Sequence, residues 1–436
     1  MQKKVFIKSY GCQMNEYDSA KIAALLANAC GLDLTIDPNI ADLIILNTCA
    51  IRAKATEKVF SELGRLRFLK KKNPKLILAV GGCVSIQEQK NIFHRAPYVD
   101  IVFGPQTLHR LPNMYENVCK KRAPIIDITS PPTEKFDYLP MPTTTGPSAS
   151  ISIMEGCNKF CSYCVVPYTR GVEVSRNLSD ILAEVITLIS QGAKEIQLLG
   201  QNVNAYRDPS KNYNFSTLLH EIAAIKAVAR VRFSTSHPAE FSDELIMAFK
   251  QEEKLANHVH LPIQSGSNRI LKLMRRGYTQ EEYQIIVAKL RNIRPDISIS
   301  TDLIVGFPTE TAEDFAATME VVKKINFDAS FSFIYSPRLN TPAANMIDDL
   351  PVAEKKKRLS ILQNQLANQS LQYSQTMIGS TQKVLVTGNA PKNPKQFSGR
   401  ADNNRIVNFS SIENVLGKIV KVKITAALAN SLLGKL

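Results

Sequence analysis

The sequence lacks a long hydrophobic run. No apolar stretch in its 436 residues approaches the ~20 residues that span a bilayer, and the start, MQKKVFIKSYG, has no apolar signal region before charges return. We therefore expect no membrane association and a cytoplasmic location. Cysteines are also sparse: the 436 residues include only 8. This low density excludes the disulfide framework of a small secreted protein. In a reducing compartment, clustered thiols more often bind metal.

Acidic residues are in deficit. The chain has 39 Asp and Glu against 54 Lys and Arg, a formal net charge of +15. Such an excess attracts polyanions, so nucleic acid is the first partner to expect. Hydrophobic residues make up 44% of the chain, which excludes a disordered or collagen-like protein and leaves material for several cores.

The order of apolar runs predicts an α/β protein of three domains. Residues 1–120 alternate short apolar runs with helical patterns, which predicts an open parallel α/β domain. Residues 121–147 are rich in proline and threonine and predict a linker. Residues 148–375 contain six strand-like runs separated by helices, which predicts a partial (β/α) barrel similar to a TIM barrel. Residues 376–436 alternate strands with turns and predict a small, OB-like β-barrel of a kind that often binds nucleic acid.

These patterns give specific elements. The strands expected in the first two domains are Lys4–Lys8, Asp42–Leu46, Leu76–Val80, Asp100–Phe103, Ala149–Met154, Glu195–Leu199, Arg230–Ser234, His258–Pro262, Ile297–Val305 and Ser330–Tyr335. The helices expected are Tyr17–Cys30, Ala53–Lys71, Ser85–Phe93, Leu178–Gln191, Thr279–Ile293 and Ala353–Met377.

The densest cysteine motif is GCNKFCSYC, in which Cys157, Cys161 and Cys164 have the spacing C-x3-C-x2-C after a strand-like run. Three thiolates on one loop can hold three corners of an iron–sulfur cube and leave the fourth iron open. An open iron can chelate S-adenosylmethionine, and an electron from the cluster can cleave its sulfonium into a 5′-deoxyadenosyl radical. The alternatives are a zinc site completed by a distant histidine and cysteines that bind no metal.

A second cysteine set is more dispersed. Cys12, Cys49 and Cys83 each follow an apolar run, in KVFIKSYGC, ADLIILNTC and KLILAVGGC. Groups just past the carboxyl ends of parallel strands meet at one crevice, so three such thiols can hold a second cluster. The alternative is three cysteines that lie in loops or in the core. The glycines beside them favour close approach of the backbone to a bulky ligand.

The motifs taken together carry a resemblance. The segments SYGCQMN, NTCAIR, GGCVS, FGPQTLHRLP, MEGCNKFCSYCVVPYTRG, LLGQNVNAY, STSHP, HLPIQSGS and FSFIYSPR, in this order, resemble the radical-SAM methylthiotransferases. The resemblance covers nearly the whole chain: an N-terminal methylthiotransferase domain, a radical-SAM barrel and a C-terminal TRAM domain. A C-x3-C-x2-C motif alone is shared by a vast superfamily, whereas the three added N-terminal cysteines narrow the resemblance to this family.

The resemblance implies two [4Fe-4S] clusters, one for each cysteine set. The central cluster would generate the radical, and the N-terminal one would carry or supply the inserted sulfur. S-adenosylmethionine would serve as methyl donor and as radical source. The expected reaction replaces C2–H by C2–S–CH3 on N6-dimethylallyladenosine at tRNA position 37, next to the anticodon. A radical is needed because no side-chain base removes a proton from an aromatic C–H group.

The resemblance also implies binding residues and partners. The contacts expected for S-adenosylmethionine are Tyr163, Gly200, Gln201, Asn202, Ser236, Gln264 and Asp302, although such residues also cap helices after strands. The phosphate contacts expected for tRNA are Lys383, Lys392, Lys395, Arg400, Arg405, Lys418, Lys421 and Lys423, and the target base has to leave its stack. We expect flavodoxin or ferredoxin as electron donor and a monomeric enzyme, and the sequence does not indicate which protein supplies the sulfur.

Two alternatives stay open at this point. One is a sibling enzyme that acts on threonylcarbamoyladenosine in tRNA or on an aspartate of a ribosomal protein. The other is a noncatalytic zinc-binding or RNA-binding scaffold, which the basic C-terminal segment would serve equally well.

Overall fold

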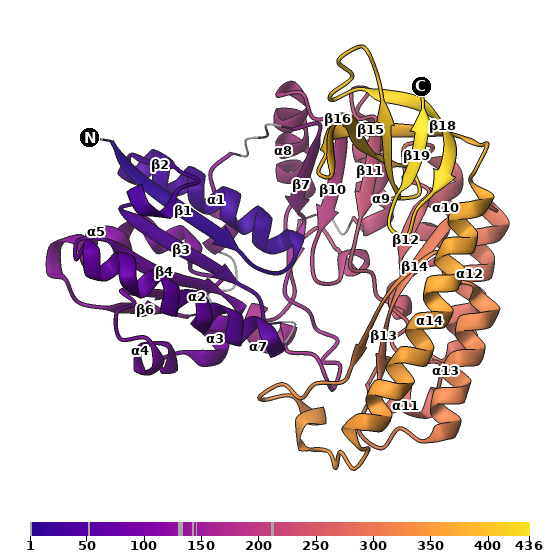
Figure 1. The fold of residues 1–436 in the computed structure, drawn as a ribbon, viewed down its shortest axis with the longest axis horizontal. Coiled ribbons are helices and arrows are strands. Elements are labelled where there is room, and N and C mark those ends of the chain that lie inside the picture. Colours follow the sequence, from indigo (N-terminus) through magenta and orange to yellow (C-terminus); the bar gives the residue numbers. More distant parts are fainter. Residues whose placement is uncertain (1, 51–52, 130–133, 142–143, 145, 211–212) are drawn as a thin grey trace. The chain divides into compact units, whose positions relative to one another are not determined.

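The computed structural model describes residues 2–50, 53–129, 134–141, 144, 146–210 and 213–436 (Figure 1). Contacts divide the chain into two compact units, each made of several segments. The first unit comprises Met1–Pro142, Met154–Val174 and Ser336–Ala344, and the second comprises Thr143–Ile153, Ser175–Tyr335 and Asn345–Leu436. All six motif cysteines therefore belong to the first unit.

The first unit contains a six-stranded parallel sheet with the order β2-β1-β3-β4-β5-β6. Its strands are β1 (Lys3–Ser9), β2 (Leu32–Leu34), β3 (Leu43–Thr48), β4 (Ile77–Gly82), β5 (Ile101–Phe103) and β6 (Ile125–Asp127). The helices of this unit are α1 (Gln13–Cys30), α2 (Ala53–Lys72), α3 (Cys83–Glu88), α4 (Asn91–Arg95), α5 (Leu111–Lys121), α6 (Glu134–Asp137) and α7 (Val166–Arg170).

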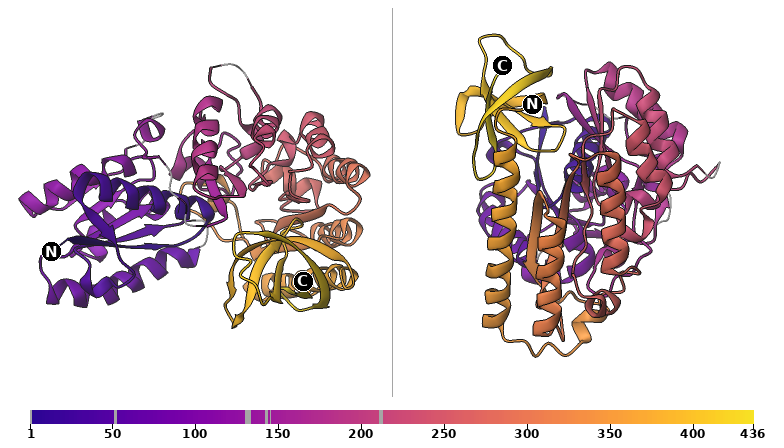
Figure 2. Two further views of the ribbon diagram at one scale, coloured as in Figure 1. Left: turned by 90° about the horizontal axis from the view of Figure 1, so that it is seen from above. Right: turned by 90° about the vertical axis from the view of Figure 1, so that its right-hand side faces the viewer.

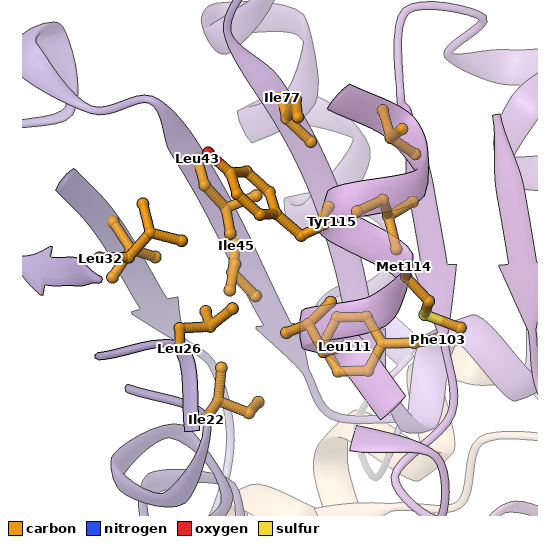
Figure 3. Close-up of a cluster of buried hydrophobic side chains, with 14 of the residues drawn as sticks. Ile22, Leu26, Leu32, Leu43, Ile45, Ile77, Phe103, Leu111, Met114 and Tyr115 are labelled. Atoms are coloured by element: carbon orange, nitrogen blue, oxygen red, sulfur yellow. The ribbon is translucent and has the colours of Figure 1, made fainter. Parts of the chain in front are cut away.

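Helices cover both faces of this sheet. Every residue of β3 and β4 is buried, as is usual for central strands of a parallel sheet. Leu26 of α1, Leu111 of α5 and Ile45 of β3 share one core (Figure 3). Leu63 of α2 shares the other core with Leu46, because neighbouring residues of a strand point to opposite faces.

The second unit contains a partial parallel barrel. One sheet has the order β11-β10-β7 and another the order β12-β13-β14, and a parallel bridge between Val231 and Leu255 extends the first toward the second. The strands are β7 (Ser148–Ser152), β10 (Glu195–Leu199), β11 (Arg230–Phe233), β12 (His258–His260), β13 (Ser298–Val305) and β14 (Ala329–Ile334). The helices are α8 (Leu178–Ser190), α9 (Phe215–Ala224), α10 (Asp243–Gln251), α11 (Asn268–Leu273), α12 (Gln280–Ile293), α13 (Ala312–Ile325) and α14 (Val352–Thr376).

A closed five-stranded barrel follows α14, which lies along β14 (Figures 1 and 2). Its order is β15-β16-β17-β19-β18, with β15 (Thr381–Ala390), β16 (Asn393–Ala401), β17 (Ile406–Ser410), β18 (Ile419–Ala427) and β19 (Leu432–Lys435). Arg230 of β11 forms an ion pair with Asp402 at 2.5 Å, and Arg232 donates to the backbone oxygen of Asp402 at 3.0 Å. Glu195 binds both arginines, at 2.6 and 2.8 Å. One ion pair and one hydrogen bond from two buried arginines thus join the parallel barrel to the small one.

The predicted fold class and the six barrel strands are confirmed. One expected helix is divided, and several described elements had no expected residue range, among them α5, α9, α10, α11 and α13. The helix expected at Ser85–Phe93 is two helices, α3 and α4, because Gln89 between them has φ +48°. The short strand β2 was missed. So was β6, which pairs with β5 although it lies within the segment 121–147 expected to be a linker. None of the helices in the described ranges has the length and apolar character of a membrane span.

Candidate active site

The three N-terminal cysteines lie at one edge of the first sheet. Cys12 follows β1 and precedes α1, Cys49 follows β3, and Cys83 follows β4 as the first residue of α3. These strands are neighbours, so their carboxyl ends share an edge. Gly11 shows how close two of the loops are, because a Cβ added there would lie 2.2 Å from Cys49 Cβ and 2.8 Å from Cys49 Sγ. Glycine is required at this contact, as φ at Gly11 is +115°.

The buried side chain of Asn15 ties these loops together. Its Nδ2 donates to the backbone oxygen of Thr48, next to Cys49, at 2.8 Å. Its Oδ1 accepts from Cys12 Sγ at 3.5 Å and from Arg170 Nη2 at 3.2 Å. One amide side chain therefore contacts the Cys12 loop, the Cys49 loop and an arginine that follows the central cysteine motif.

The surroundings of Cys12 favour its thiolate. A hydrogen bond with Cys49 is the main cause that lowers the pKa of Cys12 to about 6, and the positive charge of Arg170 acts in the same direction. Iron binds the thiolate form of cysteine. An ionised thiol, two further thiols at the same sheet edge and a fixed positive charge fit an iron–sulfur cluster in composition and in charge.

The central cysteines lie on a loop that begins at a narrow turn. The loop is bracketed by β8 (Met154–Glu155) and β9 (Val174–Ser175), which pair with each other. Gly156 has φ +81°, and a Cβ on it would lie 1.9 Å from the backbone oxygen of Val172. The amide of Cys157 donates to the backbone oxygen of Gly171 at 3.2 Å, and that of Cys164 donates to the backbone oxygen of Cys161 at 2.9 Å. Burial raises the pKa of the Cys157 thiol.

The two cysteine sets are joined by apolar contacts. Ala50, Cys83, Val84 and Val165 form one buried cluster, and α3 contacts α7. Val165 directly follows Cys164 in sequence. The sequence motifs predict both sets, but not that the end of the central loop packs against a cysteine of the other set.

A ring of four buried charges lies beside the cysteines. Lys135 of α6 binds Asp18 of α1 at 2.9 Å and Glu155 at 2.7 Å. Arg170 binds the same two carboxylates, at 3.0 Å and 2.5 Å. All four side chains are only 2–3% exposed. Sequence reasoning missed this ring, although Glu155 and Arg170 flank the central cysteines within MEGC and YTRG.

The second unit holds the barrel residues expected to bind S-adenosylmethionine. Asn202 lies in the loop after β10 and Ser236 in the loop after β11. A backbone hydrogen bond of 3.2 Å from Val203 to Thr235 joins these loops. The side-chain oxygen and nitrogen of Asn202 and the hydroxyl of Ser236 are buried without a hydrogen-bond partner among the residues that the structure describes. Buried polar atoms are usually paired, so these three fit a polar ligand such as S-adenosylmethionine.

The other expected contacts are spread over both units. Gly200 and Gln201 come between β10 and Asn202. The backbone N–H of Gln264, a residue with φ +73°, donates to the backbone oxygen of Asp302 at 2.9 Å. The carboxylate of Asp302 lies 3.5 Å from His260 Nε2. Tyr163 belongs to the first unit with the cysteine loop.

Lysines face one another on the small barrel. Lys383 of β15 lies directly opposite Lys421 of β18, and Lys423 lies directly opposite Lys435 of β19. All four residues are exposed. Like charges in opposite positions destabilise a sheet, so this surface favours an anionic partner. Lys435, which the sequence analysis did not single out, completes the set; its strand, LLGK, has no alternation of basic and apolar residues that could have indicated it.

The remaining basic residues fall into two groups. Lys392, Lys395, Arg400 and Lys418 are exposed, as a phosphate contact requires. Arg405 is not: its Nη2 donates to the backbone oxygens of Asp328 and Ser370, at 2.9 and 3.3 Å, and its guanidinium lies over the ring of Tyr373. We therefore correct the expectation for Arg405, which fastens the small barrel to α14 and to Asp328, the residue just before β14.

No three His, Cys, Asp or Glu side chains within the described ranges are arranged to hold a single metal ion.

Three regions match known families. Residues 4–104 match an uncharacterised protein family, UPF0004, residues 151–322 match the radical SAM superfamily, and residues 375–436 match the TRAM domain. These regions follow the order of the open sheet, the parallel barrel and the closed barrel.

Curated relatives match the chain from end to end. A tRNA-2-methylthio-N(6)-dimethylallyladenosine synthase of Coxiella burnetii (strain RSA 331 / Henzerling II) is 54% identical and covers 100% of both chains. The protein of the same name from Legionella pneumophila (strain Corby) is 56% identical over 100% of this chain and 98% of its own. That of Salmonella arizonae is 54% identical over 100% and 92%.

Solved structures share the fold at low identity. The radical S-adenosylmethionine methyltransferase TsrM from Kitasatospora setae, with cobalamin and a [4Fe-4S] cluster bound, aligns with a TM-score of 0.60 at 16% identity, covering 79% of this chain and 77% of its own. The cobalamin-dependent S-adenosylmethionine radical enzyme OxsB aligns with a TM-score of 0.57 at 13% identity, covering 84% and 56%.

Proposed function

The chain belongs to the family of tRNA-2-methylthio-N(6)-dimethylallyladenosine synthases, and from this premise we infer its reaction. It is a radical-SAM transferase that inserts a methylthio group at C2 of N6-dimethylallyladenosine at position 37 of tRNA. It uses S-adenosylmethionine and a [4Fe-4S] cluster. The observation that carries this conclusion is identity of 54–56% along the whole chain to enzymes of that name.

The same observation decides between the alternatives. The relatives carry the name of the dimethylallyladenosine enzyme, which favours it over the siblings that act on threonylcarbamoyladenosine or on a ribosomal protein. The radical SAM match favours an enzyme over a noncatalytic scaffold. Mass analysis of tRNA nucleosides from a deletion strain, with and without the gene restored, tests the substrate. Loss of any other methylthio nucleoside in place of the dimethylallyl one would reject it.

The roles that we assign to the central residues follow the chemistry. When bound, the cluster and S-adenosylmethionine supply the radical that an unreactive aromatic C–H bond requires. Cys157, Cys161 and Cys164 would ligate that cluster from a loop fixed at Gly156. Asn202 and Ser236 would hydrogen-bond S-adenosylmethionine, which would satisfy their buried polar atoms. The contacts of Tyr163, Gly200, Gln201, Gln264 and Asp302 stay predictions.

We propose that the N-terminal cysteines hold a second [4Fe-4S] cluster, which takes part in sulfur insertion. Three features support it: Cys12, Cys49 and Cys83 share one sheet edge, the pKa of Cys12 is lowered to about 6, and Arg170 provides positive charge. A cluster ligated by three thiolates carries negative charge, which a fixed guanidinium stabilises.

Iron counting tests the second cluster. Iron and acid-labile sulfide are measured per chain after anaerobic reconstitution, for the native protein and for a variant with Cys12, Cys49 and Cys83 changed to alanine. We expect about eight irons to fall to about four. A variant with Cys30 and Cys119 changed to alanine should keep about eight. If the native protein and the triple variant both hold about four, the N-terminal cysteines are structural. Zinc without iron would favour the scaffold.

The remaining partners are proposals as well. We propose that tRNA phosphates lie along the basic surface of Lys383, Lys421, Lys423 and Lys435, and that the enzyme works as a cytoplasmic monomer. Reduced flavodoxin or ferredoxin is the proposed electron donor. It would be rejected if neither protein supports turnover by enzyme that dithionite activates. The source of sulfur is not assigned.

The domain boundaries 1–120, 121–147, 148–375 and 376–436 also stay proposals, apart from β6, which belongs to the first sheet.

A further inference from the structure

Arg170 lies in the segment of the central cysteine motif and also contacts a residue that holds the loops of the N-terminal cysteines. Six residues before it, Cys164 closes the central cysteine motif. Its own guanidinium reaches Asn15, the side chain that also contacts Cys12 and the loop of Cys49. It is thus a direct polar link within the first unit between the segment of one cysteine set and the loops of the other.

The ring of buried charges holds Arg170 in this position. Burying four charged side chains carries a large desolvation cost, and the arrangement is stable only if each charge is well paired. Asp18 and Glu155 each bind both Lys135 and Arg170, so two cations balance two anions. The ring is neutral by itself, and Arg170 cannot turn away without leaving two carboxylates with one partner.

The position of Arg170 brings its charge to the thiols. Its electrostatic interactions include Cys83 and Cys12. These two cysteines follow β4 and β1, which lie on either side of β3. A single guanidinium therefore acts on thiols from both sides of the N-terminal cysteine set.

We propose that Arg170 is a positioning residue for the N-terminal cluster, which it serves from the segment of the central cysteine motif. Through Asn15 it fixes the loops of Cys12 and Cys49, and its positive charge stabilises the more negative, reduced form of the group that these cysteines hold. The inference rests on the proposed second cluster. It adds that the reduction potential and retention of that cluster depend on a residue of the central segment.

The test isolates the N-terminal cluster in the full chain. With Cys157, Cys161 and Cys164 changed to alanine, any cluster that remains is the N-terminal one, and it takes up one electron from dithionite on reduction. In this background, Arg170→Gln should shift the midpoint potential, followed by electron paramagnetic resonance, to more negative values. It should also speed the release of iron to a chelator about tenfold or more, as loss of an outer-shell partner does at metal sites. Arg170→Lys should restore most of the potential.

A matched control comes from the second unit. Arg358 is also buried and pairs with buried Glu310 at 2.7 Å, so Arg358→Gln reproduces the loss of a buried ion pair. We expect it to leave the potential and the iron release unchanged. The proposal is overturned if Arg170→Gln leaves both unchanged, or if Arg358→Gln changes them equally.

Two further outcomes are informative. Should Arg170→Gln fail to fold, Asn15→Leu keeps the charge ring and removes the hydrogen bonds of Asn15 to Cys12, Thr48 and Arg170. Faster iron release in this variant supports the link, and unchanged release overturns it. If the background variant with Arg170 intact binds no iron, the second cluster itself is wrong, and this inference falls with it. That outcome appears before Arg170 is altered, so the two failures are distinguishable.

Discussion

Lys135 and Asp18 form an ion pair at 2.9 Å between side chains that are only 2–3% exposed. Such a pair is costly to break, because removing one partner leaves the other charge buried and unbalanced. We expect Lys135→Met to lower the free energy of unfolding by about 3–5 kcal/mol. Hydrogen exchange of the α1 amides measures the change locally. Lys8→Met, which breaks a more exposed pair with Glu62, should cost about 1 kcal/mol or less. Equal losses in both variants would contradict this.

Gly156 determines whether the central cysteine loop can form. A Cβ at this position would lie 1.9 Å from the backbone oxygen of Val172, and φ is +81°. We expect Gly156→Ala to lose about four of about eight irons and all methylthiolation. Gly64→Ala is the control, because a Cβ added at Gly64 would have nothing within 4 Å and alanine favours the helix by about 1 kcal/mol. A Gly156→Ala protein with its full iron content would show that the turn is not required.

Asn202 and Ser236 should distinguish ligand binding from stability. Their polar side-chain atoms are buried and have no hydrogen-bond partner in the described part of the chain, so Ser236→Ala should leave the free energy of unfolding unchanged. Each alanine variant should weaken S-adenosylmethionine about fivefold or more in equilibrium dialysis with reconstituted protein. Ser374→Ala should lower the free energy of unfolding and leave the affinity for S-adenosylmethionine unchanged, because the hydroxyl of Ser374 donates to the backbone oxygen of Ser370 at 2.8 Å. Unchanged affinity in both site variants would remove them from the cofactor site.

The lysines of the small barrel should give tRNA binding a steep dependence on salt. Changing Lys421 and Lys423 to alanine should reduce the slope of log affinity against log salt by about 2, one for each lost phosphate contact. The same change should stabilise the free protein, since it relieves repulsion from Lys383 and Lys435. Alanine at Lys323 and Lys324, exposed at the end of α13, should leave the slope unchanged. An unchanged slope in the barrel variant would place the RNA elsewhere.

Asp328 should make stability depend on pH. Burial raises the pKa of Asp328 to about 6, above its ordinary value of 3.8. The folded state therefore holds this proton more tightly than the unfolded state, and the contribution of Asp328 to stability falls as pH rises from about 4 to about 6. Asp328→Asn removes the titrating carboxyl, and its side-chain oxygen can still accept from the amide of Ile299. The free energy of unfolding of the variant, relative to that of the native protein, should therefore rise by about 3 kcal/mol between about pH 4 and pH 6 and then stay constant. Denaturant unfolding at pH 4, 5, 6 and 7 measures it. A constant difference would show that Asp328 stays ionised.

Sequence patterns were sufficient for the elements that depend on local chemistry. The runs LIILNT and ILAVGG are apolar throughout, which predicts buried parallel strands. Because the chain places Cys49 and Cys83 directly after such strands, the topology alone puts them at one edge of a sheet. A C-x3-C-x2-C spacing is equally local.

The remainder depends on contacts between distant residues. Arg170 and Asn15 are separated by 155 positions and Lys135 and Asp18 by 117, and no periodic pattern encodes such a pairing. Arg405 is of a residue type that often contacts phosphate, and only its hydrogen bonds to the backbone oxygens of Asp328 and Ser370 show its structural role. Residues 125–127 lie at the start of a proline-rich segment, so the sequence did not predict a strand there. Their pairing with β5 shows that they form one.

The division of the first unit into three stretches of chain has a consequence for synthesis. Its sheet is complete once β6 has emerged from the ribosome, but Glu155, Arg170 and residues 336–344 emerge later. Until then, Asp18 and Lys135 lack two of the charges that surround them in the finished protein. Domains generally fold as they leave the ribosome, N-terminal parts first. The first unit therefore cannot form all its contacts until segments translated after its sheet have been made. Both cysteine sets reach their final surroundings only when most of the chain has been synthesised.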